Sequence, residues 1–198
     1  MKTIHYYLSP KSPWTYLGHD RLLDLARRHE AVVLPKPMDL GSIFPVSGGL
    51  PLDKRPPQRQ AYRITELKRW SEFLGMPLTI HPKFFPVDDV PAAKMVTAAI
   101  MAGDHDGALK LTGALLRAVW AEERNIADPK TLVEIGNECG LDGSGLYAAR
   151  ESASDFYRQH TKDAMELQVF GAPWYEYRGV SYWGQDRLEF LGRALEQD

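Results

Sequence analysis

The spacing of hydrophobic positions changes from strand-like to helical near residue 12. Residues 4–8 have the aromatic and β-branched bias of a strand. After them, apolar residues recur at helical spacing, at Tyr16, Leu17, Leu22, Leu23, Leu25 and Ala26. A second apolar run at 31–40 indicates another strand. The chain therefore begins with a strand, a helix and a strand, for which a right-handed crossover is expected.

The middle of the chain is predicted to be helical after an irregular segment. Residues 41–57 are rich in Gly, Pro and Ser, which predicts a loop. This loop could be a binding lid or an ordinary surface linker. A helix is predicted over 58–74, with candidate core positions at Tyr62, Leu67, Trp70, Phe73 and Leu74. Beyond an irregular stretch at 81–90, helices are predicted over 92–102, 105–123, 128–139, 142–150 and 152–167, with Asp104 and Asp128 as N-caps.

The strand pattern returns after Phe170. Residues 174–177 and 180–183 are predicted strands, joined by Arg178 and Gly179 as a hairpin. A last helix is predicted over about 185–196. The strand elements thus enclose a long helical block, and the pattern by itself indicates an α/β or α+β protein.

Composition narrows the classes of function. With 198 residues and 44% hydrophobic content, the chain is expected to form one domain, or one domain with a large insertion. The net charge of −2 argues against a nucleic-acid partner. Neither a signal peptide nor an apolar run of about 18 residues is found, so a soluble, cytoplasmic protein without a membrane partner is expected.

The cysteine and histidine content excludes two further kinds of site. The chain has one cysteine, which excludes an intramolecular dithiol centre. Cys139 falls on a helical pattern with Leu132 and Ile135, so a buried structural thiol is expected. The six histidines show none of the usual metal-ligand spacings, so no metal is predicted.

Ser12 is the candidate reactive position. Pro13 suits the first position of a helix, because its missing N–H would have no intrahelical partner there. Ser12 is then the predicted N-cap, beside unpaired backbone N–H groups and the positive end of the helix dipole. An anion at Ser12 would be stabilised. The alternative is that Ser12 only caps its helix.

Three stretches carry a resemblance to a known family. They are Ser-Pro-Trp-Thr-Tyr-Leu-Gly at 12–18, Val-Phe-Gly-Ala-Pro at 169–173 with Trp-Gly-Gln-Asp-Arg-Leu at 183–188, and, less specifically, Arg-Trp-Ser-Glu-Phe-Leu-Gly-Met-Pro-Leu at 69–78. The chain resembles 2-hydroxychromene-2-carboxylate isomerases and kappa-class glutathione transferases over nearly its whole length. These are cysteine-free relatives of DsbA-type proteins, and Ser12 and Thr15 stand where the two DsbA cysteines would be.

The resemblance implies a fold. It is an α/β, thioredoxin-like fold with a large all-helical insertion between its βαβ and ββα halves. The thioredoxin-like domain would comprise about residues 1–57 and 168–198, and the insertion about 58–167. Relatives are commonly dimers, so a homodimer is possible.

The resemblance also implies a glutathione site. The glutathione sulfur would lie against Ser12, whose hydroxyl would donate to the thiolate. Pro173 matches the cis-proline of thioredoxin-like folds, and Ala172 before it would pair its backbone with the cysteinyl unit. Gln185 and Asp186 would hold the carboxylate and ammonium of the γ-glutamyl group.

The glycyl carboxylate has several candidate partners. Arg59 lies near the position where kappa-class enzymes carry a lysine, with Lys54, Arg55 and Arg63 as alternatives. The asparagine that family members use after the second strand has no counterpart between Gly41 and Arg59. Lys11 replaces an apolar residue of the relatives and could itself favour a thiolate.

The leading functional hypothesis is a glutathione-dependent isomerase or transferase that acts on an aromatic-derived electrophile. Trp14, Tyr16, Phe44 and Trp174 are candidates for an apolar substrate wall. One alternative is a non-catalytic thiol- or peptide-binding protein with a thioredoxin-like fold. The other, a disulfide oxidoreductase, is disfavoured by Ser12 and Thr15.

Overall fold

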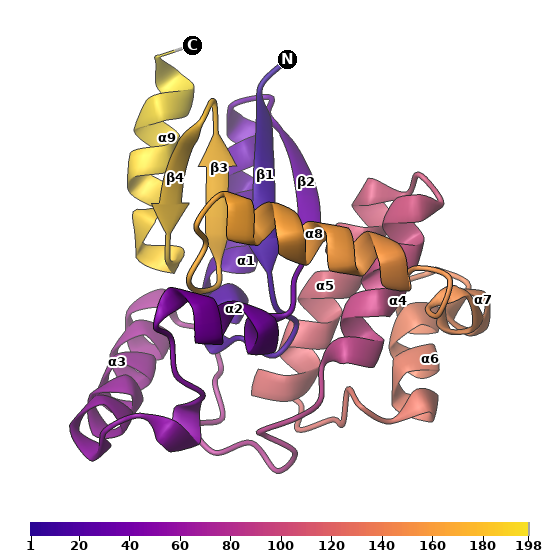
Figure 1. The fold of residues 1–198 in the computed structure, drawn as a ribbon, viewed down its shortest axis with the longest axis horizontal. Helices are drawn as coiled ribbons and strands as arrows, with labels where there is room; N and C mark the ends of the chain where they lie inside the picture. The colour runs from indigo at the N-terminus through magenta and orange to yellow at the C-terminus, as the bar shows by residue number, and fades with distance from the viewer. Residues whose placement is uncertain (198) are drawn as a thin grey trace.

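A four-stranded mixed sheet, in the order β2-β1-β3-β4, lies at the centre of the computed structural model, which describes residues 1–197 (Figure 1). The strands are β1 (Thr3–Leu8), β2 (Val32–Pro37), β3 (Trp174–Tyr177) and β4 (Val180–Trp183). β1 pairs in parallel with β2 and antiparallel with β3, and Arg178 and Gly179 connect β3 to β4 as the sequence predicted. The strands at the two ends of the chain therefore share one sheet.

Helices cover both faces of the sheet. Successive strand residues point to opposite faces, so Tyr6 packs with α1 (Pro13–Arg28) and α9 (Leu188–Glu196), whereas Tyr7 packs on the other side. There, α2 (Leu40–Ser47) and α8 (Ser154–Glu166) cover the sheet. In Figure 1, α8 crosses in front of the strands and α1 lies behind them.

The remaining helices come between β2 and β3 in sequence. They are α3 (Pro57–Leu74), α4 (Val90–Met101), α5 (His105–Trp120), α6 (Pro129–Glu138) and α7 (Gly143–Ala149). The ends of α4 to α8 lie within three residues of the predicted ends. Asp104 and Asp128 cap α5 and α6 as predicted, each accepting from a backbone N–H.

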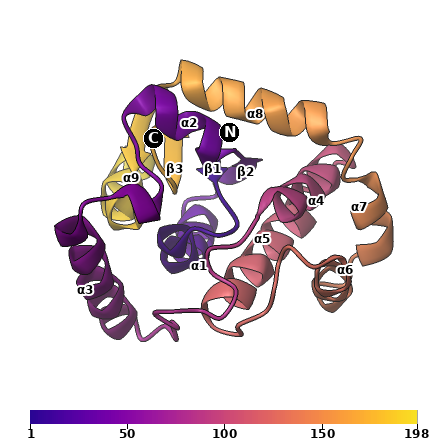
Figure 2. The same cartoon turned by 60° about the horizontal axis from the view of Figure 1, so that its bottom comes forward.

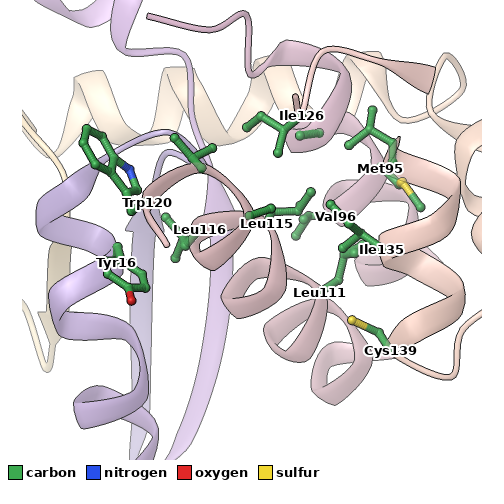
Figure 3. Packing of buried hydrophobic residues seen from close by; sticks show 14 of the residues in the cluster. Tyr16, Met95, Val96, Leu111, Leu115, Leu116, Trp120, Ile126, Ile135 and Cys139 are labelled. Atoms are coloured by element: carbon green, nitrogen blue, oxygen red, sulfur yellow. The ribbon is translucent and has the colours of Figure 1, made fainter. Parts of the chain in front are cut away.

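A second hydrophobic core joins these helices to α1. Leu111 and Leu115 of α5 lie between Tyr16 of α1 and Met95 of α4, and Trp120, at the end of α5, lies on the Tyr16 side of the cluster (Figure 3). This packing fixes the start of α1, where Ser12 lies, against the helical block.

The loop predicted over 41–57 is wrong for part of its length. Asp39 caps α2 by accepting from the Gly41 N–H at 2.8 Å, and Gly48, with φ of 74°, ends the helix. Ile43 is fully buried under the sheet. A short 3₁₀ helix, η1 (Leu52–Lys54), follows. Capping and tertiary packing therefore form a helix from a composition typical of a loop.

Two predicted core positions on α3 are wrong as well. Tyr62 is 62% exposed and Phe73 is 77% exposed, while Leu67 is fully buried and Trp70 and Leu74 are half-buried. α3 lies at the periphery (Figure 2), so only a narrow stripe of it meets the rest of the protein.

Candidate functional site

The site is built around the junction between β1 and α1. Ser12 has an extended backbone, and its Oγ accepts from the Thr15 N–H at 3.2 Å, which confirms it as the N-cap. Pro13 is in the first helical turn, as predicted. Free N–H groups of the first turn and the helix dipole give this point a positive potential.

A segment from the other end of the chain meets this junction. The Ser12 Oγ donates to the Ala172 carbonyl oxygen at 3.3 Å, although 160 positions separate the two residues. The Ala172–Pro173 peptide bond is cis, as the resemblance implied, and so is the unpredicted Phe85–Pro86 bond. Ser12 and Ala172 are both buried. The structure thus brings together the two motifs that the sequence singled out.

A cavity of about 760 Å³ lies beside this junction. It is bounded by the first turn of α1, the segment from α2 to α3, and the ends of β3 and β4. Its lining comprises Trp14, Phe44, Ser47, Gly48, Gly49, Leu50, Arg55, Gln58, Arg59, Tyr62, Arg63, Glu66, Trp70, Phe170, Ala172, Trp183, Gly184, Gln185, Asp186 and Arg187.

Most residues proposed from the sequence lie at or next to this cavity. Arg59, Ala172, Gln185 and Asp186 line it, as do Trp14 and Phe44, while Ser12 and Pro173 adjoin Ala172. Gln185 is buried and is held by Arg21, which donates to both its side-chain and its backbone oxygen. Gln185 and Asp186 belong to a short 3₁₀ helix, η2 (Gln185–Arg187), that leads into α9.

Two predicted wall residues do not line the cavity. The Tyr16 hydroxyl donates to the Pro77 carbonyl at 2.7 Å inside the helical core. Trp174 is buried on the side of the sheet that α2 and α8 cover. Both side chains belong to the hydrophobic cores and are not available as a wall of this cavity.

Phe170 and Trp183 take the place of those residues, and the sequence analysis missed them. Their rings meet edge to face, with centroids 4.7 Å apart, and both are about half exposed. A Cβ at Gly171 would lie 2.6 Å from the Trp183 indole nitrogen, so only glycine permits this approach. Both residues are part of the family-like stretches at 169–173 and 183–188, which was the available signal.

The wall formed by α3 and the segment just before it is cationic. Arg55, Arg59 and Arg63 line it, and none of them forms an ion pair within residues 1–197. The acidic residues Glu66 and Asp186 are instead bound to Arg69 and Arg187. The cavity therefore carries unpaired positive charge on one side.

Arg63 occupies the most enclosed position of the three. Its guanidinium lies 5.6 Å from the ring centre of Phe85 and 5.8 Å from that of Trp120. Burial, and then the charge of Arg55, lower the pKa of Arg63 to about 10. An anion in the cavity would relieve this repulsion. Lys54 does not line the cavity.

Cys139 lies elsewhere. It is buried near the end of α6, and burial raises the pKa of its thiol. It borders a separate cavity of about 610 Å³ between α1 and α5. In the described residues, no three His, Cys, Asp or Glu side chains gather as metal ligands, and no helix has the length and apolarity to cross a membrane.

A mixed sheet with a capped helix after its first strand, facing a cis-proline, defines a thioredoxin-like protein. The family model for DSBA-like thioredoxin domains matches residues 3–196. The chain therefore belongs to the DSBA-like thioredoxin family, and the α/β thioredoxin-like fold inferred from the motifs is confirmed.

Similar proteins include two named as 2-hydroxychromene-2-carboxylate isomerases and one named as a glutathione transferase. A 2-hydroxychromene-2-carboxylate isomerase of Sphingobium xenophagum is 29% identical over 98% of both chains. A glutathione S-transferase kappa 1 of Caenorhabditis elegans is 22% identical over 98% of this chain and 91% of its own. The solved structure of a 2-hydroxychromene-2-carboxylate isomerase superposes with a TM-score of 0.83 at 23% identity, over 98% of this chain and 95% of that one. Relatives of this kind support an enzyme of a glutathione-related isomerase family.

Proposed function

We propose that the protein is a glutathione-dependent isomerase or transferase that acts on an aromatic electrophile. The observation that carries the proposal is the position of Ser12. Its hydroxyl lies at the start of α1, 3.3 Å from the Ala172 carbonyl and next to an open cavity. The names of two relatives add support, because one is a glutathione transferase and the other is an isomerase.

Glutathione would extend from Ser12 along the cavity. Its cysteinyl sulfur would lie against Ser12, and its cysteinyl backbone would pair with Ala172. The γ-glutamyl ammonium would meet Asp186, whose carboxylate now accepts from Arg187 at 2.6 Å, and Gln185 would lie beside it. Arg59 would hold the glycyl carboxylate from the opposite wall.

The chemistry follows from a thiolate held at a helix N-terminus. The Ser12 hydroxyl turns from the Ala172 carbonyl to the sulfur, and the helix dipole favours the thiolate over the thiol. The thiolate adds to the β-carbon of a conjugated carbonyl compound, and the electrons of the carbon–carbon double bond shift so that negative charge forms on the carbonyl oxygen. In an isomerase, the resulting single bond rotates, and the electron pair returns as the thiolate leaves. In a transferase, the carbon–sulfur bond is kept, and the enolate carbon takes a proton from water as the carbonyl re-forms.

The walls of the cavity indicate the kind of electrophile. Trp14, Phe44, Phe170 and Trp183 provide aromatic surface, and the arginine wall provides positive charge. The substrate would therefore be an aromatic compound that carries an acidic group. The carboxylate in the name of the Sphingobium relative is consistent with this class.

Calorimetric titration with glutathione, followed by kinetics on a panel of acidic aromatic enones, tests the proposal. We expect saturable glutathione binding and turnover that requires the thiol, so S-methylglutathione should bind without supporting turnover. Failure to bind glutathione would overturn the proposal. Binding without turnover would instead favour a non-catalytic thiol-binding protein.

The remaining alternative is disulfide exchange. Cys139 is the one cysteine of the chain, and it is buried with a raised thiol pKa. We expect no reduction of insulin disulfides, and the Cys139→Ser variant should keep the glutathione-dependent activity. Disulfide exchange that survives this substitution would contradict the assignment of the site to Ser12.

A further inference from the structure

We infer that the ion pair between Lys11 and Asp89 sets the charge next to the Ser12 site, and that Asp89 is a positioning residue for the segment before Ser12. The inference rests on the proposed binding of a thiolate at Ser12. It concerns two residues that lie outside the cavity lining and that the proposed mechanism does not use.

Asp89 reaches this segment from the start of α4. Its side chain is 8% exposed, and its two carboxylate oxygens take different partners. One lies 2.7 Å from the Lys11 Nζ, and the other accepts from the Ser9 Oγ at 2.6 Å. A buried carboxylate is stable only with such partners. Asp89 thus connects α4 to both Ser9 and Lys11.

The same segment is held at two further points. The Ser12 N–H donates to the Ser9 carbonyl at 3.0 Å, and the Trp120 indole donates to the Lys11 carbonyl at 3.2 Å. The direction of the Ser12 hydroxyl therefore depends on a turn fixed by α4 and α5. The hydrogen bond from Ser9 to Asp89 is the contact of this turn that can be removed without changing its charge.

The surroundings of Asp89 are acidic apart from Lys11. Asp88 precedes it in the loop before α4, Asp39 caps α2, and Tyr157 faces them from α8. Burial, with the charges of Asp89, Asp39 and Asp88, raises the pKa of Tyr157. Within residues 1–197, Asp89 has its ion pair with Lys11 alone. Loss of Lys11 would leave a net negative charge near Ser12, and loss of Asp89 would leave a net positive one.

These charges predict opposite shifts in the pKa of bound glutathione thiol. Lys11→Met should raise the thiol pKa, because the remaining carboxylate disfavours the thiolate. Asp89→Asn should lower it, because Lys11 is left uncompensated while the Asn oxygen still accepts from Ser9. At about 10 Å, a unit charge shifts a pKa by roughly 0.3 to 1 unit, depending on the local dielectric. The double variant should return to the wild-type value.

The measurement is the pH dependence of thiolate absorbance near 240 nm in the glutathione complex. Lys94 and Glu151 provide a matched control, because Lys94 is also on α4 and its Nζ lies 3.0 Å from the Glu151 carboxylate. Lys94→Met should leave the thiol pKa unchanged. Single variants that do not shift it, or a double variant that shifts it further than either single one, would overturn the inference.

The positioning role has its own test. Ser9→Ala keeps the charge pair but removes the hydrogen bond, so we expect a raised thiol pKa and a several-fold lower kcat with little change in glutathione affinity. A lower melting temperature with an unchanged thiol pKa and kcat would show that Ser9 and Asp89 only stabilise the fold. Failure of the wild-type protein to bind glutathione would count against the proposed function, whereas normal binding with unshifted variants would count against this inference alone.

Discussion

The two walls of the cavity differ in how firmly the protein holds them. On the Ser12 wall, Leu8 of β1, Leu17 of α1 and Tyr175 of β3 are fully buried, and two cores meet there. On the opposite wall, Leu67 is the one residue of the 18-residue helix α3 that is buried. Local stability follows buried apolar contacts. The candidate reactive group is therefore on the firm wall, and the arginines are on the loosely packed one.

This difference suits two different tasks. A hydroxyl that must donate to a sulfur atom needs a fixed position, because a small displacement removes much of its stabilisation of the thiolate. Arginines that receive a carboxylate have long side chains and tolerate movement of the helix that carries them. We therefore expect substitutions on the Ser12 wall to change the reaction, and those on α3 to change which molecules bind.

The largest expected effect compares a leucine from each wall. Leu17→Ala should lower the global free energy of unfolding by about 2–5 kcal/mol, as for other buried leucines. Leu67→Ala should cost less globally but should speed amide hydrogen exchange throughout α3, because this helix can separate before the rest unfolds. Urea unfolding measures the global free energy of unfolding, and hydrogen exchange measures the local opening of α3. Equal global losses, with unchanged exchange in α3, would show that both walls belong to one cooperative unit.

The protein should also lose stability in acid, through the face of the sheet that α2 and α8 cover. His160 of α8 is buried on the same side of the sheet as Trp174, and burial, then Lys36, lowers its pKa from 6.5 to about 4. Between these values the unfolded chain binds a proton that the folded protein does not, so stability falls as the pH falls from about 6.5 to 4. The loss would reach about 3 kcal/mol. Urea unfolding at pH 7, 5.5 and 4.5 measures it, and His160→Gln should remove the His160 contribution to this slope but leave that of His19, whose pKa burial also lowers.

The sequence predicted the firm wall better than the loose one. The cap at Ser12 follows from Ser-Pro and the helical spacing after it, and the cis bond at Pro173 was implied by a motif within five residues. Such features are encoded locally. Tyr62 and Phe73 follow the same apolar spacing as buried residues, but α3 has too little of the protein beside it to cover them.

The cavity walls themselves depend on long-range packing. Tyr16 and Trp174 lie near Ser12 and Pro173 in sequence, yet both point into the cores. The direction of a side chain at the end of an element depends on which neighbours cover it. Nothing in the local sequence shows that Arg63 lies over Phe85 and Trp120, because three separate elements form that arrangement.

The next smaller effect concerns Ser12 itself. Ser12→Ala should cost about 1 kcal/mol of stability as a lost N-cap. It should also raise the thiol pKa of bound glutathione and slow turnover by one to two powers of ten. The reason is that a hydrogen-bond donor to a charged group contributes roughly 1.5–3 kcal/mol. Ser12→Thr should retain more activity. Absorbance near 240 nm and kcat are the measurements, and an unchanged thiol pKa in Ser12→Ala would reduce Ser12 to a cap.

The smallest expected effect separates two arginines of the loose wall. If Arg59 holds the glycyl carboxylate and Arg63 binds the acidic group of the electrophile, Arg59→Gln should lower the affinity for glutathione and Arg63→Gln should not. Arg63→Gln should instead raise KM for 3-benzoylacrylate about fivefold but leave its methyl ester unaffected, since a partly exposed ion pair contributes about 1 kcal/mol. Lys68→Gln is the matched control, because Lys68 is exposed on α3 and does not line the cavity. The contrary outcome is that both arginine variants lower glutathione affinity equally and leave KM for 3-benzoylacrylate unchanged relative to its methyl ester. The arginine wall would then bind glutathione alone, and the charge of the electrophile would have to be recognised on the firm wall.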